Sequence, residues 1–85
     1  MNAVFSPQCW EDYQYWSQTD RSVLRRINSL IEIAKYDPAG GVGKPERLVH
    51  ELDGCWSRRI TGEHRLVYMT RETGVVFVQA RYHYS

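Results

Sequence analysis

The chain has 85 residues, of which 42 % are hydrophobic, so it is long enough for one small domain and too apolar to be disordered. A formal net charge of +1 does not mark the whole protein as one that binds nucleic acid. Two cysteines, Cys9 and Cys55, are too few for the disulfide framework of a small secreted domain, and we expect both to be reduced and packed. The first residues do not form a signal peptide, and the longest apolar run, 75–78, is too short to span a bilayer. We therefore expect a cytoplasmic protein without a membrane segment.

The first 36 residues predict a short strand followed by two helices. The strand is expected at Asn2–Phe5. Ser6 then suits the N-cap of a helix that has Pro7 at its first position and runs to about 18. The expected apolar face of this helix consists of Cys9, Trp10, Tyr13 and Trp16. Asp20 suits the N-cap of a second helix, which ends near Tyr36 because Asp37-Pro38 cannot continue it. The apolar residues of the second helix recur at helical spacing; they are Val23, Leu24, Ile27, Leu30, Ile31 and Ala34.

The second half of the chain predicts four strands. The loop at 39–43 is not a phosphate-binding loop, because neither Ser nor Thr follows Lys44. After it the apolar residues alternate, which favours strands at 47–52, 55–60, 65–70 and 75–82. Turns at 53–54, 61–63 and 71–74 join them as hairpins. The predicted fold is a single α+β domain over residues 1–85, in the order β-α-α-β-β-β-β, with a small antiparallel sheet and two N-terminal helices packed on one face.

Basic residues are concentrated after residue 20, since residues 1–20 contain three acidic residues and no Lys or Arg. A basic surface on the sheet half is one interpretation, and ordinary solvated charges are the other. The residues of this half that could carry chemistry are Glu46, His50, Arg58, Arg59, His64, Arg65, Arg81, His83 and Tyr84. Trp56, Tyr68 and Tyr82 would either stack on nucleotide bases or, more commonly for such residues, pack in the core.

Cleavage of RNA requires a base for the 2′-OH, a cation for the charge on the phosphorane, and an acid for the 5′-oxygen. Glu, Arg and His can fill these roles in that order. Most small domains contain such a set, so the set alone is a weak indication of a nuclease. The cysteines and histidines lack metal-binding spacing, and we expect no metal site and no cofactor.

The order of these residues along the chain is far more specific than their presence. The segments GKPE (43–46), WSRRIT (56–61), EHRLVY (63–68) and RYHY (81–84), with W-x-D-Y-x-Y-W at 10–16, resemble the YoeB (Txe) family of the RelE/ParE toxin superfamily. The resemblance spans nearly the whole chain. It implies a small antiparallel sheet with two N-terminal helices, which is also the fold predicted from the pattern of apolar residues.

The resemblance also implies a function. Members of the family are toxins of type II toxin–antitoxin systems that act as ribosome-dependent endoribonucleases, cleave mRNA in the A site and inhibit translation. It implies Glu46 as general base, Arg65 as transition-state clamp, His83 as general acid and Tyr84 as a residue that orients the scissile nucleotide. Two further positions are implied as phosphate contacts, namely Lys44 and Arg59.

Partners follow from the same resemblance. It implies a cognate antitoxin of the YefM (Axe) type, the ribosome and mRNA, a homodimer, and operator DNA only through the antitoxin complex. The chain departs from the family pattern at two places: Ser85 follows Tyr84, and Cys55 stands where an aromatic residue is common.

Two alternative functions stay open at this point. A ParE-like toxin would inhibit gyrase and cut no RNA, and that group lacks the Glu, Arg and His set. A non-catalytic module would bind the ribosome or DNA without cleavage. An assay for mRNA cleavage in a translation mixture separates these alternatives from a nuclease.

Overall fold

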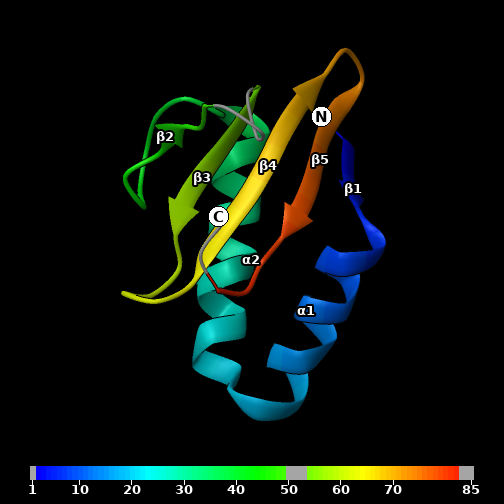
Figure 1. Ribbon diagram of the computed structural model, residues 1–85, viewed down its shortest axis with the longest axis vertical. Helices are drawn as coiled ribbons and strands as arrows, with labels where there is room; N and C mark the ends of the chain where they lie inside the picture. The colour runs from blue at the N-terminus through cyan, green and yellow to red at the C-terminus, as the bar shows by residue number, and fades with distance from the viewer. Residues whose placement is uncertain (1, 50–53, 83–85) are drawn as a thin grey trace.

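Both helices cover the same face of one five-stranded sheet (Figure 1). The computed structural model describes residues 2–49 and 54–82. Within these residues the elements are β1 (Asn2–Phe5), α1 (Pro7–Thr19), α2 (Arg21–Tyr36), β2 (Glu46–Arg47), β3 (Cys55–Arg59), β4 (Arg65–Arg71) and β5 (Gly74–Gln79). Neither helix in the described ranges is long and apolar enough to cross a membrane. The α+β class and the predicted element order are confirmed.

The strands follow the order β1-β5-β4-β3-β2 across the sheet. Strands β2 to β5 run antiparallel to their neighbours, whereas β1 joins β5 in parallel, so the sheet is mixed rather than entirely antiparallel. Ser6 explains the parallel edge, because it binds β5 directly after β1 ends. Its N–H donates to the Phe77 carbonyl at 2.9 Å, and its hydroxyl donates to the Val78 carbonyl at 2.7 Å.

The strand ends differ from those predicted. β2 is only Glu46–Arg47, and β5 ends at Gln79 instead of Tyr82. Residues 50–52 of the predicted strand, Asp53 of the predicted turn, and residues 83–85 lie outside the described residues. Gly54 has a φ of +93°, which only glycine adopts easily and which suits a tight hairpin turn.

Side-chain caps fix the start of both helices as the sequence predicts. The Ser6 hydroxyl accepts the Cys9 N–H at 3.0 Å, with Pro7 in the first turn. The Asp20 carboxylate accepts the N–H groups of Ser22 and Val23 at the start of α2. A hydrogen bond from the Ser22 side chain and these N–H groups lower the pKa of Asp20. These caps satisfy N–H groups that have no partner within the helix.

The buried face of α1 differs from the predicted one. Its buried residues are Cys9, Asp12 and Trp16, whereas Trp10 is 51 % exposed and stacks on the Tyr13 ring. The buried stripe therefore includes a carboxylate that an apolar pattern does not reveal. On α2 the buried residues are Ile27, Leu30, Ile31 and Ala34, which all belong to the predicted stripe.

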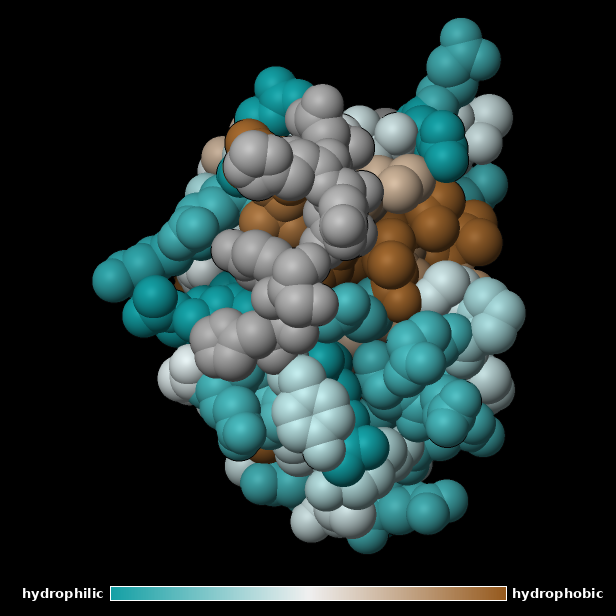
Figure 2. All heavy atoms as spheres, in the orientation of Figure 1, coloured by the Kyte–Doolittle hydropathy of each residue, from teal (hydrophilic) through white to brown (hydrophobic). Residues whose placement is uncertain are grey.

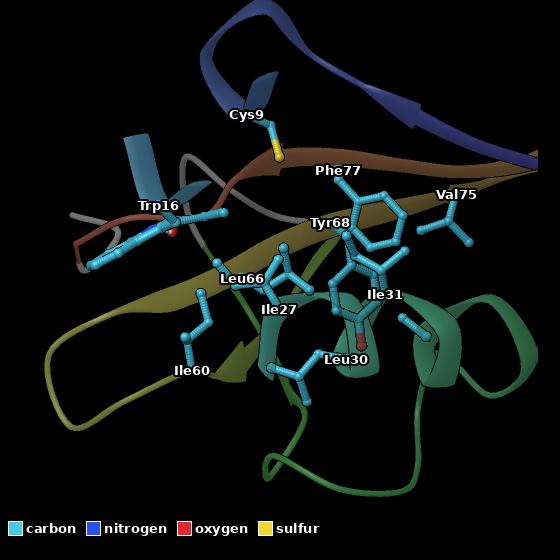
Figure 3. Close-up of a cluster of buried hydrophobic side chains, with 12 residues drawn as sticks. Cys9, Trp16, Ile27, Leu30, Ile31, Ile60, Leu66, Tyr68, Val75 and Phe77 are labelled. Atoms are coloured by element: carbon cyan, nitrogen blue, oxygen red, sulfur yellow. Dashed lines mark hydrogen bonds between the residues drawn. The ribbon is translucent and has the colours of Figure 1, made fainter. Parts of the chain in front are cut away.

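The main core lies between the helices and the sheet (Figure 3). Trp16 of α1 and Leu30 of α2 belong to the same cluster as Leu66 and Tyr68 of β4 and Phe77 of β5. A second, smaller cluster of buried residues consists of Leu48, Cys55 and Val67, with Met69 and Val78 packed against it. Side chains alternate along β3 and β4, so Cys55 and Val67 belong to the opposite side of the sheet from Leu66 and Tyr68. We call this side, which neither helix covers, the open face.

Candidate active site

Two arginines face each other across β3 and β4. In the antiparallel register Arg59 pairs with Arg65, two residues beyond the pair of Ser57 with Val67. Val67 is on the open face, and residues two apart on a strand share a face, so Arg59 and Arg65 are on it too. Directly opposite residues have Cβ atoms about 5 Å apart, and like charges at such positions destabilise a sheet. A pair of this kind is costly to the fold and suited to an anion.

Glu46 is on the same face. It pairs with Ser57 across β2 and β3, and Ser57 stands two residues before Arg59. Adjacent strands are about 4.8 Å apart and rise about 3.4 Å per residue, so the Cα atoms of Glu46 and Arg65 are separated by roughly 12 Å. The register thus places Glu46, Arg59 and Arg65 on one face of the sheet.

Backbone carbonyls hold the Arg65 guanidinium. Its Nη1 donates to the carbonyl oxygens of Thr61 at 2.8 Å, Gly62 at 3.2 Å and His64 at 3.1 Å. The turn itself is held by the Thr61 hydroxyl, which accepts the N–H groups of Glu63 and His64. These bonds restrict the side chain before any ligand binds. Among the described residues, Nε and Nη2 of this guanidinium make no hydrogen bond and can bind a phosphate in the fork geometry that arginine favours.

The loop that carries Lys44 is anchored by a buried arginine. Arg58 is completely buried, and its Nη1 and Nη2 donate to the carbonyl oxygens of Val42 and Asp37. Its Nε donates to the Tyr68 hydroxyl at 2.9 Å, and that hydroxyl donates to the Pro38 carbonyl. Arg58 and Tyr68 therefore hold three carbonyl groups of the segment between α2 and β2.

Burial has an electrostatic effect at Tyr68. Removal from water raises the pKa of this tyrosine above its ordinary value, although the neighbouring Arg58 charge opposes the change. Tyr68 is thus neutral and able to donate its proton to Pro38 at physiological pH. The sequence alone allowed Tyr68 either to pack in the core or to stack on bases, and its full burial assigns it to the core.

Gly43 brings the same loop against β3. Its carbonyl accepts the Arg59 N–H at 2.7 Å, and its φ is +97°. A Cβ at this position would lie 3.1 Å from Leu30 Cδ2 and 3.3 Å from Arg58 Cβ, so a larger residue would push the loop away. Lys44 follows in the left-handed region at φ 51° and is exposed. The loop thus places an exposed cation two residues before Glu46.

The surface of the open face is mixed in character. Figure 2 looks onto this side and shows an apolar area bordered by hydrophilic residues. The apolar residues of this side include the second cluster around Val67, with Met69 and Val78. The polar site residues and the apolar patch therefore share one surface.

The end of the chain breaks the alternation that the sequence predicts. β5 stops at Gln79, and Tyr82 has a φ of 62°, which a regular strand excludes. Tyr82 is 52 % exposed, so it does not pack in the core. The predicted catalytic residues His83 and Tyr84 lie outside the described residues.

Sequence reasoning named Arg58 and His64 without giving either a role, and it missed the burial of Asp12. The alternation of β3 places Arg58 on the helix-covered face together with Trp56, and this was a usable signal for a buried arginine. Asp12 stands four residues before Trp16, so both are on one side of α1. That spacing does not indicate that both side chains bind the main chain of Ala80, near the other end of the chain.

Known proteins resemble the chain over its whole length. The sequence model of a family described as the YoeB-like toxin of bacterial type II toxin–antitoxin systems matches residues 5–84. Toxin YoeB of Streptomyces coelicolor is 52 % identical over 84 residues, which cover 99 % of this chain and 100 % of that protein. Toxin YoeB of Escherichia coli is 46 % identical with the same coverage.

Solved structures agree with the sequence relatives. A YoeB/ParE toxin from Agrobacterium tumefaciens has a TM-score of 0.94 and 43 % identity, covering 99 % of this chain and 100 % of its own. A YoeB–YefM complex from Staphylococcus aureus gives a TM-score of 0.90 at 41 % identity, and a YoeB dimer from the same organism gives 0.91 at 42 %. Both cover 99 % of this chain and 98 % of their own. The chain belongs to the YoeB-like toxins of bacterial type II toxin–antitoxin systems.

Proposed function

We propose that this toxin is an endoribonuclease that cleaves mRNA in the ribosomal A site and thereby inhibits translation. The observation that carries the proposal is the pair of facing arginines, Arg59 and Arg65, on the same open face as Glu46. Two guanidinium groups at facing positions repel each other, and an anion between them relieves that repulsion. The phosphodiester of RNA is such an anion, and Glu46 is a base within reach of the neighbouring ribose.

In the proposed reaction Glu46 accepts the proton of the 2′-OH, and the 2′-oxygen attacks the adjacent phosphorus. Negative charge grows on the non-bridging oxygens, where Arg65 and Arg59 stabilise it. The bond from phosphorus to the 5′-oxygen then breaks, and His83 supplies the proton that this oxygen needs to leave. The products are a 2′,3′-cyclic phosphate and a 5′-hydroxyl.

The remaining site residues have supporting roles in this proposal. Tyr84 orients the scissile nucleotide, and Lys44 contacts a phosphate outside the reacting one. Every role is filled by a side chain of the toxin, so the reaction as proposed uses no metal ion and no cofactor.

We propose partners from the relatives whose structures are known. The Staphylococcus aureus protein forms a complex with YefM and a dimer. A YefM-type antitoxin would cover the open face of this chain and silence it, and acidic residues of the antitoxin would complement Arg59 and Arg65. The toxin would also form a homodimer, and it would reach operator DNA only through the antitoxin complex.

The test is cleavage of a defined mRNA in a reconstituted translation reaction, with the cut position and end groups mapped. The wild-type toxin should cut within the A-site codon and leave a 2′,3′-cyclic phosphate. Glu46→Gln should lose activity by about 10²–10⁴-fold, as is typical for loss of an acid or base. Glu72→Gln makes the same change in the turn after β4 and should leave cleavage unchanged.

Other results would decide against the proposal. A 3′-hydroxyl product would exclude attack by the 2′-oxygen. Intact mRNA together with inhibited gyrase would identify a ParE-like toxin, and intact mRNA with stalled ribosomes would identify a non-catalytic module.

A further inference from the structure

Two side chains of α1 bind the main chain of Ala80, directly after β5 ends. The Ala80 N–H donates to Asp12 Oδ2 at 2.9 Å, and the Ala80 carbonyl accepts the Trp16 Nε1–H at 2.8 Å. All three residues are buried. Side chains of α1 thus form hydrogen bonds with both main-chain polar groups of Ala80, the first residue after β5.

Two residues later the chain is held again, this time by the start of β4. The Tyr82 N–H donates to His64 Nδ1 at 2.7 Å, and the Tyr82 carbonyl accepts the Arg65 N–H at 3.1 Å. Tyr82 has a φ of 62°, a conformation that residues other than glycine rarely adopt unless their surroundings impose it. The bonds from His64 and Arg65 are the contacts that impose it.

His64 is built into the protein as a fixed acceptor. Its side chain is only 12 % exposed, and its ring meets the Trp16 ring edge-on with centroids 4.8 Å apart. Because an amide N–H donates to Nδ1, that nitrogen carries no proton, and the hydrogen of the neutral ring is on Nε2. Nε2 lies 3.3 Å from the Glu63 carboxylate, which favours this tautomer.

The bonds to Tyr82 fix the backbone directly before the proposed general acid. The Tyr82 carbonyl is part of the peptide unit that joins Tyr82 to His83, and a peptide unit is planar. The bonds from His64 and Arg65 therefore fix the backbone of Tyr82, the last residue before His83. The same bond network contains the Arg65 amide, so Tyr82 and the proposed phosphate clamp share one support.

We propose that His64 is a positioning residue, whose Nδ1 fixes the Tyr82 amide and thereby aligns the segment that carries the general acid. The inference rests on the proposed function for its catalytic consequence. Its structural part, the bond between the Tyr82 amide and His64 Nδ1, stands on the geometry alone.

Three substitutions at His64 separate the acceptor from the packing of the ring. In His64→Asn the amide oxygen occupies about the position of Nδ1, because both atoms are bonded to Cγ. His64→Gln places its amide one bond further out, near the position of Nε2. His64→Phe keeps an aromatic ring against Trp16 but has no acceptor. If the acceptor matters, only the Asn variant should behave like the wild type.

The first readout is the hydrogen-exchange rate of individual amides in the full-length toxin, measured by NMR. The Tyr82 amide should be protected in the wild type and in His64→Asn, and should exchange faster in His64→Gln and His64→Phe. The Ala80 amide, which Asp12 holds, should stay protected in all four proteins and serves as the internal control for folding. Unchanged Tyr82 protection in the Gln and Phe variants would overturn the proposed bond.

The second readout is the single-turnover rate of mRNA cleavage on the ribosome. His64→Gln and His64→Phe should lose on the order of 10²-fold, the effect of a misplacement of about 1 Å in a catalytic group, while His64→Asn retains most of the activity. Full activity of all variants, or activity of the Phe variant without that of the Asn variant, would overturn the positioning role. An inactive wild-type toxin would instead overturn the proposed function, and the exchange rates would then decide on the bond by themselves.

Discussion

Arg59 and Arg65 are directly opposite each other on adjacent antiparallel strands, on the face of the sheet that no helix covers. Nothing in the described register places a carboxylate in that pair to neutralise it, since the facing partner of Glu46 is Ser57. The fold therefore keeps a repulsive pair at the centre of its candidate site. This arrangement is typical of residues retained for binding at some expense of stability.

Removal of one of these charges should stabilise the toxin while weakening its activity. We expect Arg59→Gln to raise the free energy of unfolding by up to about 1 kcal/mol at low ionic strength, the size of unfavourable cross-strand pairs. The gain should shrink in 1 M salt, which screens the repulsion. The control is Arg71→Gln, because the residue that pairs with Arg71 in the described register is Gly74 rather than a second cation. Urea unfolding at two salt concentrations measures both variants, and equal effects of the two substitutions would contradict a specific repulsion.

Two substitutions should separate the contributions that the charge and the planar shape of the Arg65 side chain make to the cleavage rate. Arg65→Ala removes both and should lower the cleavage rate by about 10²–10³-fold, as does loss of one donor to a developing oxyanion. Arg65→Lys keeps the charge but lacks the planar fork that binds the turn carbonyls and a phosphate together, so its rate should fall between those of wild type and Arg65→Ala. Single-turnover cleavage of ribosome-bound mRNA provides the measurement. Wild-type rates for Arg65→Ala would exclude a clamp at this position.

The buried Arg58 should be essential for folding of the loop before β2. Arg58→Leu removes the hydrogen bonds to the carbonyls of Val42 and Asp37, of which Asp37 keeps only the Gly40 N–H at 3.4 Å, and each lost hydrogen bond from a charged group costs about 1.5–3 kcal/mol. We expect a loss of about 2–5 kcal/mol in the free energy of unfolding. Tyr68→Phe removes only a hydroxyl and should cost about 1 kcal/mol.

The double variant of Arg58 and Tyr68 tests whether the two residues act as one unit. Because they share a hydrogen bond, the combined loss should be smaller than the total of the single losses. Strict additivity in a denaturation cycle would show that each supports the loop independently.

Stability at alkaline pH should depend on Cys9. Burial, together with the nearby Asp12 charge, raises the pKa of the Cys9 thiol to about 12. An unfolded chain releases this proton near pH 9, so between about pH 9 and about pH 12 the folded state holds more protons than the unfolded one. The contribution of the thiol to stability is therefore complete below about pH 9 and declines as pH rises through this window.

Comparison with Cys9→Ala isolates that contribution. The variant should be less stable at pH 7, because a buried side chain is shortened, but its stability should fall less steeply above about pH 9. Urea titrations at several pH values measure the difference between the two proteins, in which the other titrating groups cancel. Parallel curves across the window would show that the thiol does not hold its proton in the folded state.

The features of the fold that could be predicted from the sequence are the ones specified by neighbouring residues. The caps at Ser6 and Asp20 and the stripe through Ile27 and Leu30 involve residues within one or two turns of each other. The parallel pairing of β1 with β5 could not be predicted in this way, because the strands that pair are at opposite ends of the chain. Hairpin turns indicate only the neighbours of the four later strands.

In the candidate site, too, the sequence predicts what neighbouring residues determine and misses what distant contacts determine. Alternation limits which residues of one strand share a face, but a shift of one residue in register would move Arg65 to the helix-covered side. The register is fixed by the turn, in which the N–H groups of Ile60 and Thr61 both donate to the His64 carbonyl. Asp12 was missed for another reason: a search for apolar stripes passes over a carboxylate whose partner is the Ala80 amide.

The bonds from α1 to the end of β5 also affect the order in which parts of the chain can fold. Asp12 and Ala80 are separated by 68 positions, and Trp16 and Ala80 by 64. A chain under synthesis has its first helix long before the residues that this helix must hold. Contacts between such distant residues form late, after the loops between them have closed. A nascent or truncated toxin without residue 80 therefore lacks a pair of bonds that join its first helix to the end of β5.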